Sequence, residues 1–192
     1  NTTRYSSPVQ IPGTTWQGGV GKLAVSEGGN AMAAIKTDGT LWAWGGNGGG
    51  QLGQNSQTEY SSPKQIGSDT TWRYLSSSGR TNFMATKTDG TLWAWGNQAD
   101  YGQLGQGDTN ARSSPIQIPG TTWHVPHGGP LFNLCTKTDG TLWATGSPQY
   151  ASIGLNQGYT GANPSKTTVQ CGGDGWIEAK MNFYGIMGTR QT

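Results

Sequence analysis

The sequence KTDGTLWAWG at residues 87–96 decides the fold of this chain, because it recurs almost unchanged. A second copy stands at residues 36–45, and a third, KTDGTLWATG, stands at residues 137–146. The first lysines of the three copies are 51 and 50 residues apart. A period of this size is typical of a propeller or another repeat array and not of an ordinary single-core domain.

An independent marker repeats with a similar period. The sequence Thr-Thr-Trp ends at Trp16, Trp72 and Trp123, and a weaker echo stands at Trp176. These tryptophans are 56, 51 and 53 residues apart. A short strand is expected after each of them, followed by a turn rich in serine or glycine and a second, apolar strand.

A third marker, Ser-Ser-Pro-x-Gln-Ile, begins at residues 6, 61 and 113. Because proline lacks a backbone donor, we interpret this segment as the outermost strand of each sheet. In the last repeat, residues 181–186 are expected to match the strand 82–86 of the second repeat. No segment shows a sustained helical pattern, so the sequence predicts an all-β protein.

The Thr-Asp-Gly-Thr unit of each copy predicts a hairpin, because Asp-Gly tolerates the positive φ angles of a tight primed turn. In the strand that follows, alternation places Trp93 and Trp95 on one face and Ala94 on the other. The aspartates are interpreted as turn residues, since the repeat spaces them around a rim, too far apart for paired acid–base work. The predicted hairpin-turn residues are Asp38, Gly39, Asp89, Gly90, Asp139 and Gly140.

Most tryptophans recur at fixed places in the repeat, which favours core packing over a surface that stacks ligands. The GQLG sequences at residues 50–53 and 102–105 are expected to send a leucine inward, between glycines whose backbone passes close to its neighbour. In the third repeat, Ile153 is expected in the same socket. The predicted repeat core comprises Trp42, Trp44, Trp93, Trp95, Trp143, Leu52, Leu104 and Ile153.

Composition and charge exclude several classes of function. The 192 residues include 12 basic and 10 acidic ones, and the basic residues are scattered singly, so there is no electrostatic footprint for nucleic acid. No stretch approaches the roughly 18 apolar residues of a membrane-spanning helix. The 33 glycines and nine tryptophans suit tight turns and an aromatic core.

Catalytic and metal chemistry find little support. Cys135 and Cys171 are the only cysteines, and a disulfide or two buried free thiols are both open, with the free thiols favoured. His124 and His127 are the only histidines, and a shared metal would need a third ligand that is not evident. We therefore predict a non-enzymatic protein with no catalytic residues, no cofactor and no metal.

Recognition surfaces are expected where the repeats differ, because a core must repeat whereas a recognition loop need not. Four segments differ between repeats, namely residues 18–30, 97–101, 124–130 and 150–163. The candidate binding residues are Asn97, Tyr101, His124, His127, Tyr150 and Tyr159.

The combined pattern KTDGTLWAWG, GQLG and SPxQI resembles the repeat of the regulator of chromosome condensation family, and the resemblance covers essentially the whole chain. It implies a β-propeller, commonly with seven four-stranded blades. The recurring SSPxQIPGTTW segments look most similar to bacterial and bacteriophage members. The functional residues of the animal nucleotide-exchange factor have no counterpart here. The tryptophans occupy ordinary core positions, so the Trp–Arg clusters of the plant ultraviolet-B receptor are not carried over either.

We therefore predict β-propeller blades of four short antiparallel strands, with three full repeats and partial ones at both ends. A seven-bladed ring with this period needs roughly 350 residues. Two explanations are open: the chain is a piece of a longer propeller, or it is an incomplete ring or arc completed by other copies. The predicted divisions of a single array over 1–192 are a partial blade 1–13, repeats at about 14–69, 70–120 and 121–170, and a partial repeat 171–192.

Two functions are predicted from this arrangement. The first is a non-enzymatic, extracellular or virion-associated structural module that self-assembles head-to-tail into a ring or fibre, with other virion or surface proteins as further partners. The alternative is a soluble, cytoplasmic β-propeller that binds a protein partner across one face, as bacterial β-lactamase-inhibitor members of this superfamily do. An enzyme with a site at the propeller mouth finds no residues in its favour.

Overall fold

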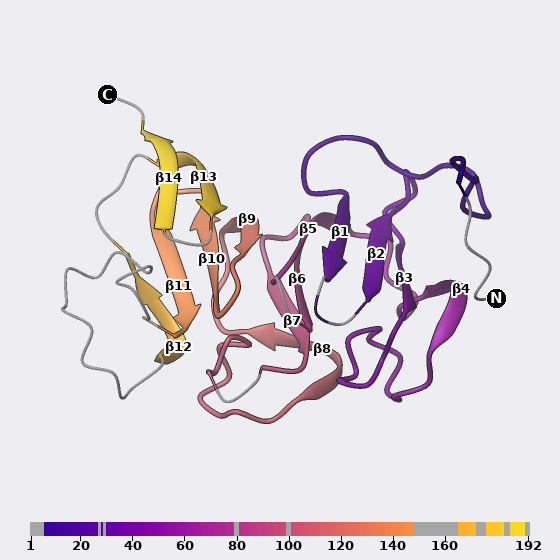
Figure 1. Ribbon diagram of the computed structural model, residues 1–192. Coiled ribbons are helices and arrows are strands. Elements are labelled where there is room, and N and C mark those ends of the chain that lie inside the picture. Colours follow the sequence, from indigo (N-terminus) through magenta and orange to yellow (C-terminus); the bar gives the residue numbers. More distant parts are fainter. Residues whose placement is uncertain are drawn as a thin grey trace.

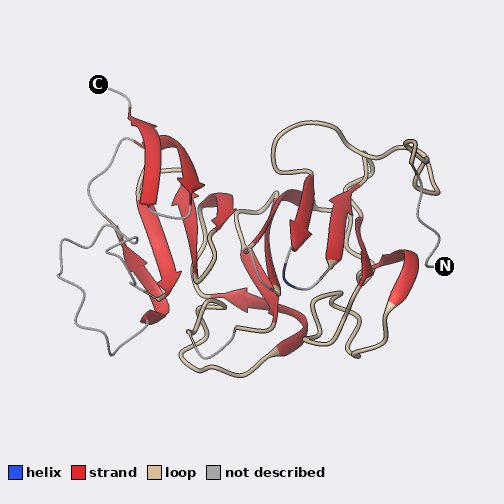
Figure 2. Cartoon of the chain, in the orientation of Figure 1, coloured by secondary structure: helices blue, strands red, loops and turns tan. Residues whose placement is uncertain are grey.

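The chain folds into antiparallel sheets arranged as an arc (Figures 1 and 2). The computed structural model describes residues 6–26, 28, 30–78, 81–98, 101–147, 165–171, 176–182 and 185–190, the last two ranges by their backbone. No α-helix occurs in these residues, and none of their elements is a helix that could cross a membrane. The prediction of an all-β chain with four-stranded blades is confirmed.

Within each sheet, every strand pairs with the next strand of the chain. The first sheet consists of β1 (Leu23–Ser26), β2 (Ala31–Ile35), β3 (Leu41–Gly45) and β4 (Tyr60–Gln65). The second consists of β5 (Trp72–Ser77), β6 (Asn82–Lys87), β7 (Leu92–Gly96) and β8 (Arg112–Ile118). The third consists of β9 (Trp123–Gly128), β10 (Phe132–Lys137), β11 (Leu142–Gly146) and β12 (Ser165–Gln170), and β13 (Trp176–Asn182) pairs with β14 (Gly185–Arg190).

The first strand of each sheet lies at the inner edge of the arc. Strands β1, β5, β9 and β13 follow one another along the upper side of Figure 1, and consecutive members of this series contact each other. The proline-bearing strands β4 and β8 lie at the opposite edge of their sheets, as expected for a residue that cannot donate to a ladder. The inner strands therefore form one continuous surface from residues that are far apart in the sequence.

The first Ser-Ser-Pro segment, residues 6–11, is not a strand, contrary to the expectation. Its side chains are exposed, Val9 at 58% and Ile11 at 41%. β4 and β8 are ordered as strands because each pairs with the Trp-Ala-Trp strand that precedes it. No such strand precedes residues 6–11 in the described part of the chain, so their backbone has no ladder to join.

The prediction of a primed turn in the hairpins is wrong. In the first copy, Gly39 N donates to Lys36 O and Lys36 N donates to Thr40 O, both at 2.9 Å. Gly39 has φ of +78°, whereas Asp38 is not among the residues with positive φ. This pattern is a three-residue loop made of a type I turn and a glycine bulge. Asp-Gly suits both the primed turn and the type I turn with a glycine bulge. Only the type I turn leaves the aspartate in an unstrained conformation.

The pairing of the last sheet corrects the alignment of the C-terminal repeat. Trp176 lies opposite Arg190, just as Trp72 lies opposite Lys87 in the second sheet. The counterpart of β6 is therefore residues 185–190 and not residues 181–186. β13 continues to Asn182, so residues 181 and 182, which were expected in the second strand, belong to the first.

Neighbouring sheets pack small residues against large ones. On the side of the first sheet that faces the second, the buried residues include Ala31, Ala33 and Ala43. They share a cluster with Phe83 and Trp95 of the second sheet, whose rings stack with centroids 5.8 Å apart. Leu92 and Ala94 face the other way, into the cluster shared with the third sheet. Alternation along the strand thus supplies each sheet with two different packing surfaces.

The opposite face of the first sheet is open. Leu23 pairs with Ala34 as Leu75 pairs with Ala85, yet Leu23 is 60% exposed and Leu75 only 2%. Met32 stands at the position of Phe83 and is likewise 37% exposed, because no blade covers this face among the described residues.

Candidate functional site

The lysine that opens each KTDGT sequence lies between two tryptophans of its own blade. Lys87 Nζ lies 4.7 Å from the ring centroid of Trp72 and 4.1 Å from that of Trp93. It also pairs with Asp69 at 2.9 Å. Because the faces of indole rings attract cations, this arrangement holds the lysine within the blade. Equivalent sandwiches form at Lys36, between Trp16 and Trp42, and at Lys137, between Trp123 and Trp143.

A chain of hydrogen bonds joins the second tryptophan of each sandwich to the hairpin. Trp93 Nε1 donates to Thr91 Oγ1 (2.9 Å), which donates to Asp89 Oδ1 (2.7 Å). The backbone N of Thr91 also donates to Asp89 Oδ1 (3.0 Å). The structure gives Asp38 and Asp139 the same bonds in their own hairpins and brings none of the three carboxylates together. They act as turn acceptors.

We expect the free energy of unfolding to decrease as the pH falls from about 5 towards 2. The Thr hydroxyl and backbone hydrogen bonds lower the pKa values of Asp38, Asp89 and Asp139 in the folded chain. A carboxylate whose pKa is depressed by folding contributes stability above its unfolded pKa and loses it as the pH falls through the folded pKa. Urea unfolding of the wild type and of the triple variant D38N/D89N/D139N at several pH values measures this. The variant should show the weaker pH dependence, and equal dependence would contradict the assignment.

The Gly-Gln-Leu-Gly turns bring neighbouring blades into backbone contact. Leu52 and Leu104 are fully buried. A Cβ at Gly50 would lie 2.8 Å from Ser113 Cα in the outermost strand of the next blade, and the backbone therefore passes as close as expected. Gly102 meets Lys166 in the same way. Ile153, the expected counterpart of these leucines, lies outside the described residues.

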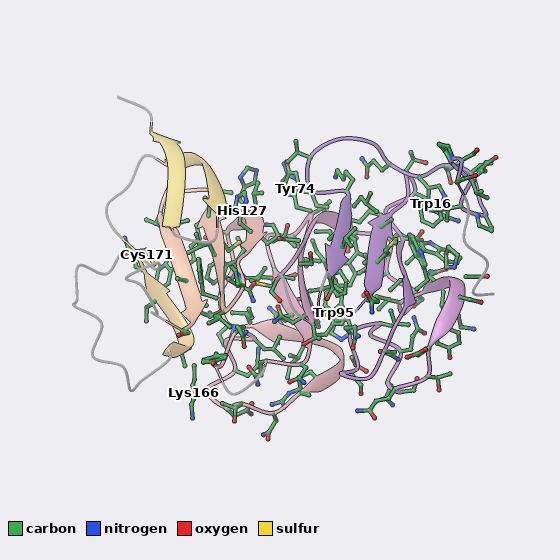
Figure 3. All side chains as sticks on the ribbon, viewed as in Figure 1. Trp16, Tyr74, Trp95, His127, Lys166 and Cys171 are labelled. Atoms are coloured by element: carbon green, nitrogen blue, oxygen red, sulfur yellow. The ribbon has the colours of Figure 1, made fainter. Side chains whose placement is uncertain are left out.

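Two of the four segments in which the repeats differ meet in one groove. Residues 18–30 contribute the loop before β1 and β1 itself, and residues 124–130 contribute most of β9. Between them lies the end of β5. We call this depression, of about 290 Å³, the inner groove. It is lined by Val20, Gly21, Leu23, Ala24, Val25, Leu75, Ser76, Ser77, Val125, Pro126 and His127. Figure 3 shows His127 at the same edge of the arc as Tyr74.

A cluster of basic side chains surrounds Tyr74 beside the inner groove. Lys22 Nζ and Arg73 Cζ lie 4.9 and 5.0 Å from the centroid of the Tyr74 ring, and His124 contacts the same ring edge-on, with centroids 5.3 Å apart. Lys22 Nζ also donates to Arg73 O. Burial, and then the charge of Arg73, lower the pKa of Lys22 and the pKa of His124.

The other predicted binding residues lie elsewhere or are not described. Asn97 follows β7, where its backbone N donates to Thr81 O (3.0 Å) and its carbonyl accepts from Asn82 Nδ2 (3.2 Å). Tyr101 N donates to Gln98 O (2.9 Å) in the turn that follows. Asn97 and Tyr101 therefore lie just after the C-terminal end of β7, and neither lines the inner groove. Tyr150 and Tyr159 lie outside the described residues.

Sequence reasoning missed the part of this site that β5 and the residue before β1 supply. Lys22, Arg73 and Tyr74 were not among the predicted binding residues. A signal was available, because His124 and Val125 of the third repeat occupy the positions of Arg73 and Tyr74 in the second. Because these residues differ between the two repeats, the comparison could have indicated β5 as well as β9 as part of the site.

The described residues contain no group of three or more His, Cys, Asp or Glu side chains able to hold a metal. His124 contacts Tyr74, whereas His127 lines the inner groove, so the two histidines have different surroundings. Cys135 and Cys171 are unpaired and buried, and burial raises the pKa of the Cys171 thiol to about 12. Neither thiol is poised as a nucleophile.

Four-stranded antiparallel sheets that succeed one another through their first strands are blades of a β-propeller. Residues 38–84 and 89–124 match the profile of the regulator of chromosome condensation (RCC1) repeat. The fold resembles that of yeast RCC1 (Prp20) in its complex with Kap60, with a TM-score of 0.72 and 18% identity. That comparison covers 90% of this chain and 42% of the yeast protein.

Curated relatives share the repeats at higher identity. The RCC2 homolog of Danio rerio is 35% identical over 126 residues, which cover 64% of this chain and 25% of that protein. The E3 ubiquitin-protein ligase HERC2 of Mus musculus is 29% identical over 107 residues, which cover 54% of this chain and 2% of the ligase. The chain thus spans about a quarter of the length of RCC2 and a far smaller share of HERC2. These relatives are eukaryotic, and the expected closeness to bacterial and bacteriophage members stays a prediction.

Proposed function

We propose that this chain is a non-enzymatic protein-interaction module built of RCC1-type blades, and that a protein partner binds along the inner groove. One observation carries the proposal: segments 18–30 and 124–130, which differ between repeats, line the same depression although about 100 residues separate them. The recurring aspartates, lysines and most of the recurring tryptophans make their hydrogen bonds and cation–π contacts within the blades. The surface available for recognition is therefore the one that varies.

Resemblance to known proteins supports a binding role. A yeast RCC1 structure contains Kap60, and a second yeast structure, with a TM-score of 0.71 and 18% identity, is described together with binding to Gsp1p and histones. These are properties of the yeast protein, and for this chain they support only the general class of partner, a protein. An E3 ubiquitin-protein ligase and a mitochondrial RCC1 domain-containing protein of Arabidopsis thaliana are among the relatives, which favours the cytoplasmic alternative over an extracellular or virion location.

The test is selection of peptides from a displayed random library on the wild-type chain, followed by affinity measurements on two variants. Val20→Asp places a charge in the inner groove at a side chain that is 78% exposed, and Val9→Asp does so outside it at a side chain that is 58% exposed. We expect the selected peptides to lose at least about tenfold in affinity, near 1.4 kcal/mol, for Val20→Asp and almost none for Val9→Asp. Equal losses, or no enriched peptide, would overturn the proposal.

Assembly with further blades is a second candidate function, because the open face of the first sheet is apolar. Its exposed residues Leu23 and Met32 stand where Leu75 and Phe83 are buried against a neighbouring blade. A copy of this chain is the occupant predicted from the sequence. Sedimentation should then show species larger than the 20.3 kDa monomer that Met32→Glu dissociates. A wild type that stays monomeric at every concentration would exclude homotypic assembly. The virion setting of that prediction gains no support from the relatives described above.

A further inference from the structure

We propose that the basic cluster around Tyr74, made of the cations Lys22 and Arg73 and the imidazole of His124, binds the carboxylates of an acidic segment in the protein partner. The inference rests on the proposed function and specifies its partner. Its starting point is that three successive blades each contribute one basic side chain: Lys22 precedes β1, Arg73 lies in β5 and His124 in β9. All three lie against one tyrosine ring.

The cluster lacks compensating charge among the described side chains. Two ion pairs occur among the described residues, Lys87 with Asp69 and Arg112 with Asp108, and neither includes a residue of the cluster. The electrostatic influence on Lys22 and on His124 comes from Arg73, and it opposes their protonation in both cases. Cations held together without a carboxylate repel one another, and an incoming anion relieves that repulsion.

The cluster differs from the other lysines that face aromatic rings. Lys36, Lys87 and Lys137 each lie between two indole rings of the repeat core. Arg73, by contrast, is exposed, and Lys22, Tyr74 and His124 are half-buried. An exposed guanidinium offers the planar fork that binds a carboxylate with two hydrogen bonds.

The position of the cluster defines the rest of the ligand. Lys22 lies between Gly21 and Leu23, both of which line the inner groove, and Leu75 and Val125 of the same groove follow Tyr74 and His124 directly. A segment bound there meets cations on one side and the exposed side chains of Val20, Leu23 and Val25 on the other. The ligand class is therefore an extended peptide that alternates acidic and aliphatic residues.

The test measures fluorescence anisotropy of a labelled peptide with four Glu-Leu repeats at low ionic strength. Its neutral counterpart with Gln-Leu repeats and a single-stranded oligonucleotide of equal charge serve as comparison probes. The variant K22Q/R73Q should bind the acidic peptide at least about tenfold more weakly than the wild type. Lys64→Gln is the matched control, because Lys64 also lies over a tyrosine ring, that of Tyr60, at an outermost strand. It should change the affinity less than twofold.

Each outcome of these measurements either supports or overturns the proposal of an acidic ligand. Salt-sensitive binding of the Glu-Leu peptide that depends on Lys22 and Arg73 supports the proposal. Equal binding of the Gln-Leu peptide, or an equal loss in Lys64→Gln, overturns it. Tighter binding of the oligonucleotide through the same residues would replace an acidic protein by nucleic acid as the partner. If library peptides lose affinity for Val20→Asp but not for K22Q/R73Q, the groove remains the binding site and only the acidic ligand is excluded.

Discussion

Gly39→Ala should destabilise the chain by about 3 kcal/mol or more, at the upper end of the usual range for one substitution. Gly39 has φ of +78°, a conformation that costs a residue with a Cβ about 1–2 kcal/mol. An added Cβ would also stand far inside van der Waals contact with Thr70 O, in the loop that leads to the next blade. That loop cannot move away freely, because Trp72 N donates to Gly39 O (3.2 Å). The expected loss therefore includes the contact between two blades.

Gly90→Ala is the matched control for this prediction. Gly90 occupies the same hairpin position with φ of +80°, so the backbone strain is nearly equal. Its added Cβ would lie 3.0 Å from Thr122 N, a distance that a small adjustment relieves. We expect a loss of about 1–2 kcal/mol here, measured by urea unfolding in parallel with Gly39→Ala. Equal losses for the two variants would show that the hairpin conformation alone, and not the contact with Thr70, determines the cost.

The sequence predicted the blades well because their signals are local. Proline in β4 and β8, the alternation of Trp93, Ala94 and Trp95, and the 51-residue period each follow from one segment and its own backbone requirements. The turn type failed because Asp-Gly fits two turns. The choice between the two turns depends on two hydrogen bonds. Thr40 N donates to Asp38 Oδ1 within the hairpin, and Trp72 N of the next blade donates to Gly39 O. Only the bond from Trp72 joins residues that are distant in the sequence.

The candidate site was predictable only in its pieces. Variation between repeats indicated residues 18–30 and 124–130, and it also indicated residues 97–101, which lie apart from the inner groove. Which segments meet depends on how the inner strands align across blades, and no pattern within one repeat contains that information. Lys22 and Tyr74 illustrate this, because they are 52 residues apart and contact each other only through the packing of β1 beside β5.

Trp95→Ala should cost about 3–5 kcal/mol of unfolding free energy, the range for truncating a large buried aromatic residue. Trp95 is fully buried between the first two sheets, stacks on Phe83 and contacts Trp72. Its Nε1 donates to Gln51 O of the preceding blade (2.9 Å). Truncation therefore leaves a cavity and an unpaired carbonyl at the same place. Figure 3 shows Trp95 in the interior of the arc.

The third blade shows why this position cannot be changed alone. There Thr145 replaces the tryptophan and donates to Gln103 O (2.6 Å), so the bond to the preceding GQLG turn is kept. Asn133 stands in place of Phe83 and donates to Asn82 Oδ1 (3.1 Å) and Gln103 O (3.0 Å), which makes this interface polar. A single Trp95→Thr change would restore the hydrogen bond but leave Phe83 without its stacking partner.

Trp44→Ala is the natural control, because Trp44 occupies the same repeat position on the open face of the first sheet. It is 9% exposed and contacts Trp16, but no sheet of the described chain covers it. We expect Trp44→Ala to cost at least about 1 kcal/mol less than Trp95→Ala, since Trp44 has fewer contacts to lose without a described sheet packed on it. Urea unfolding of both variants in dilute protein measures the difference. Equal losses would mean that packing within a blade, and not packing between blades, supplies the stability of these tryptophans.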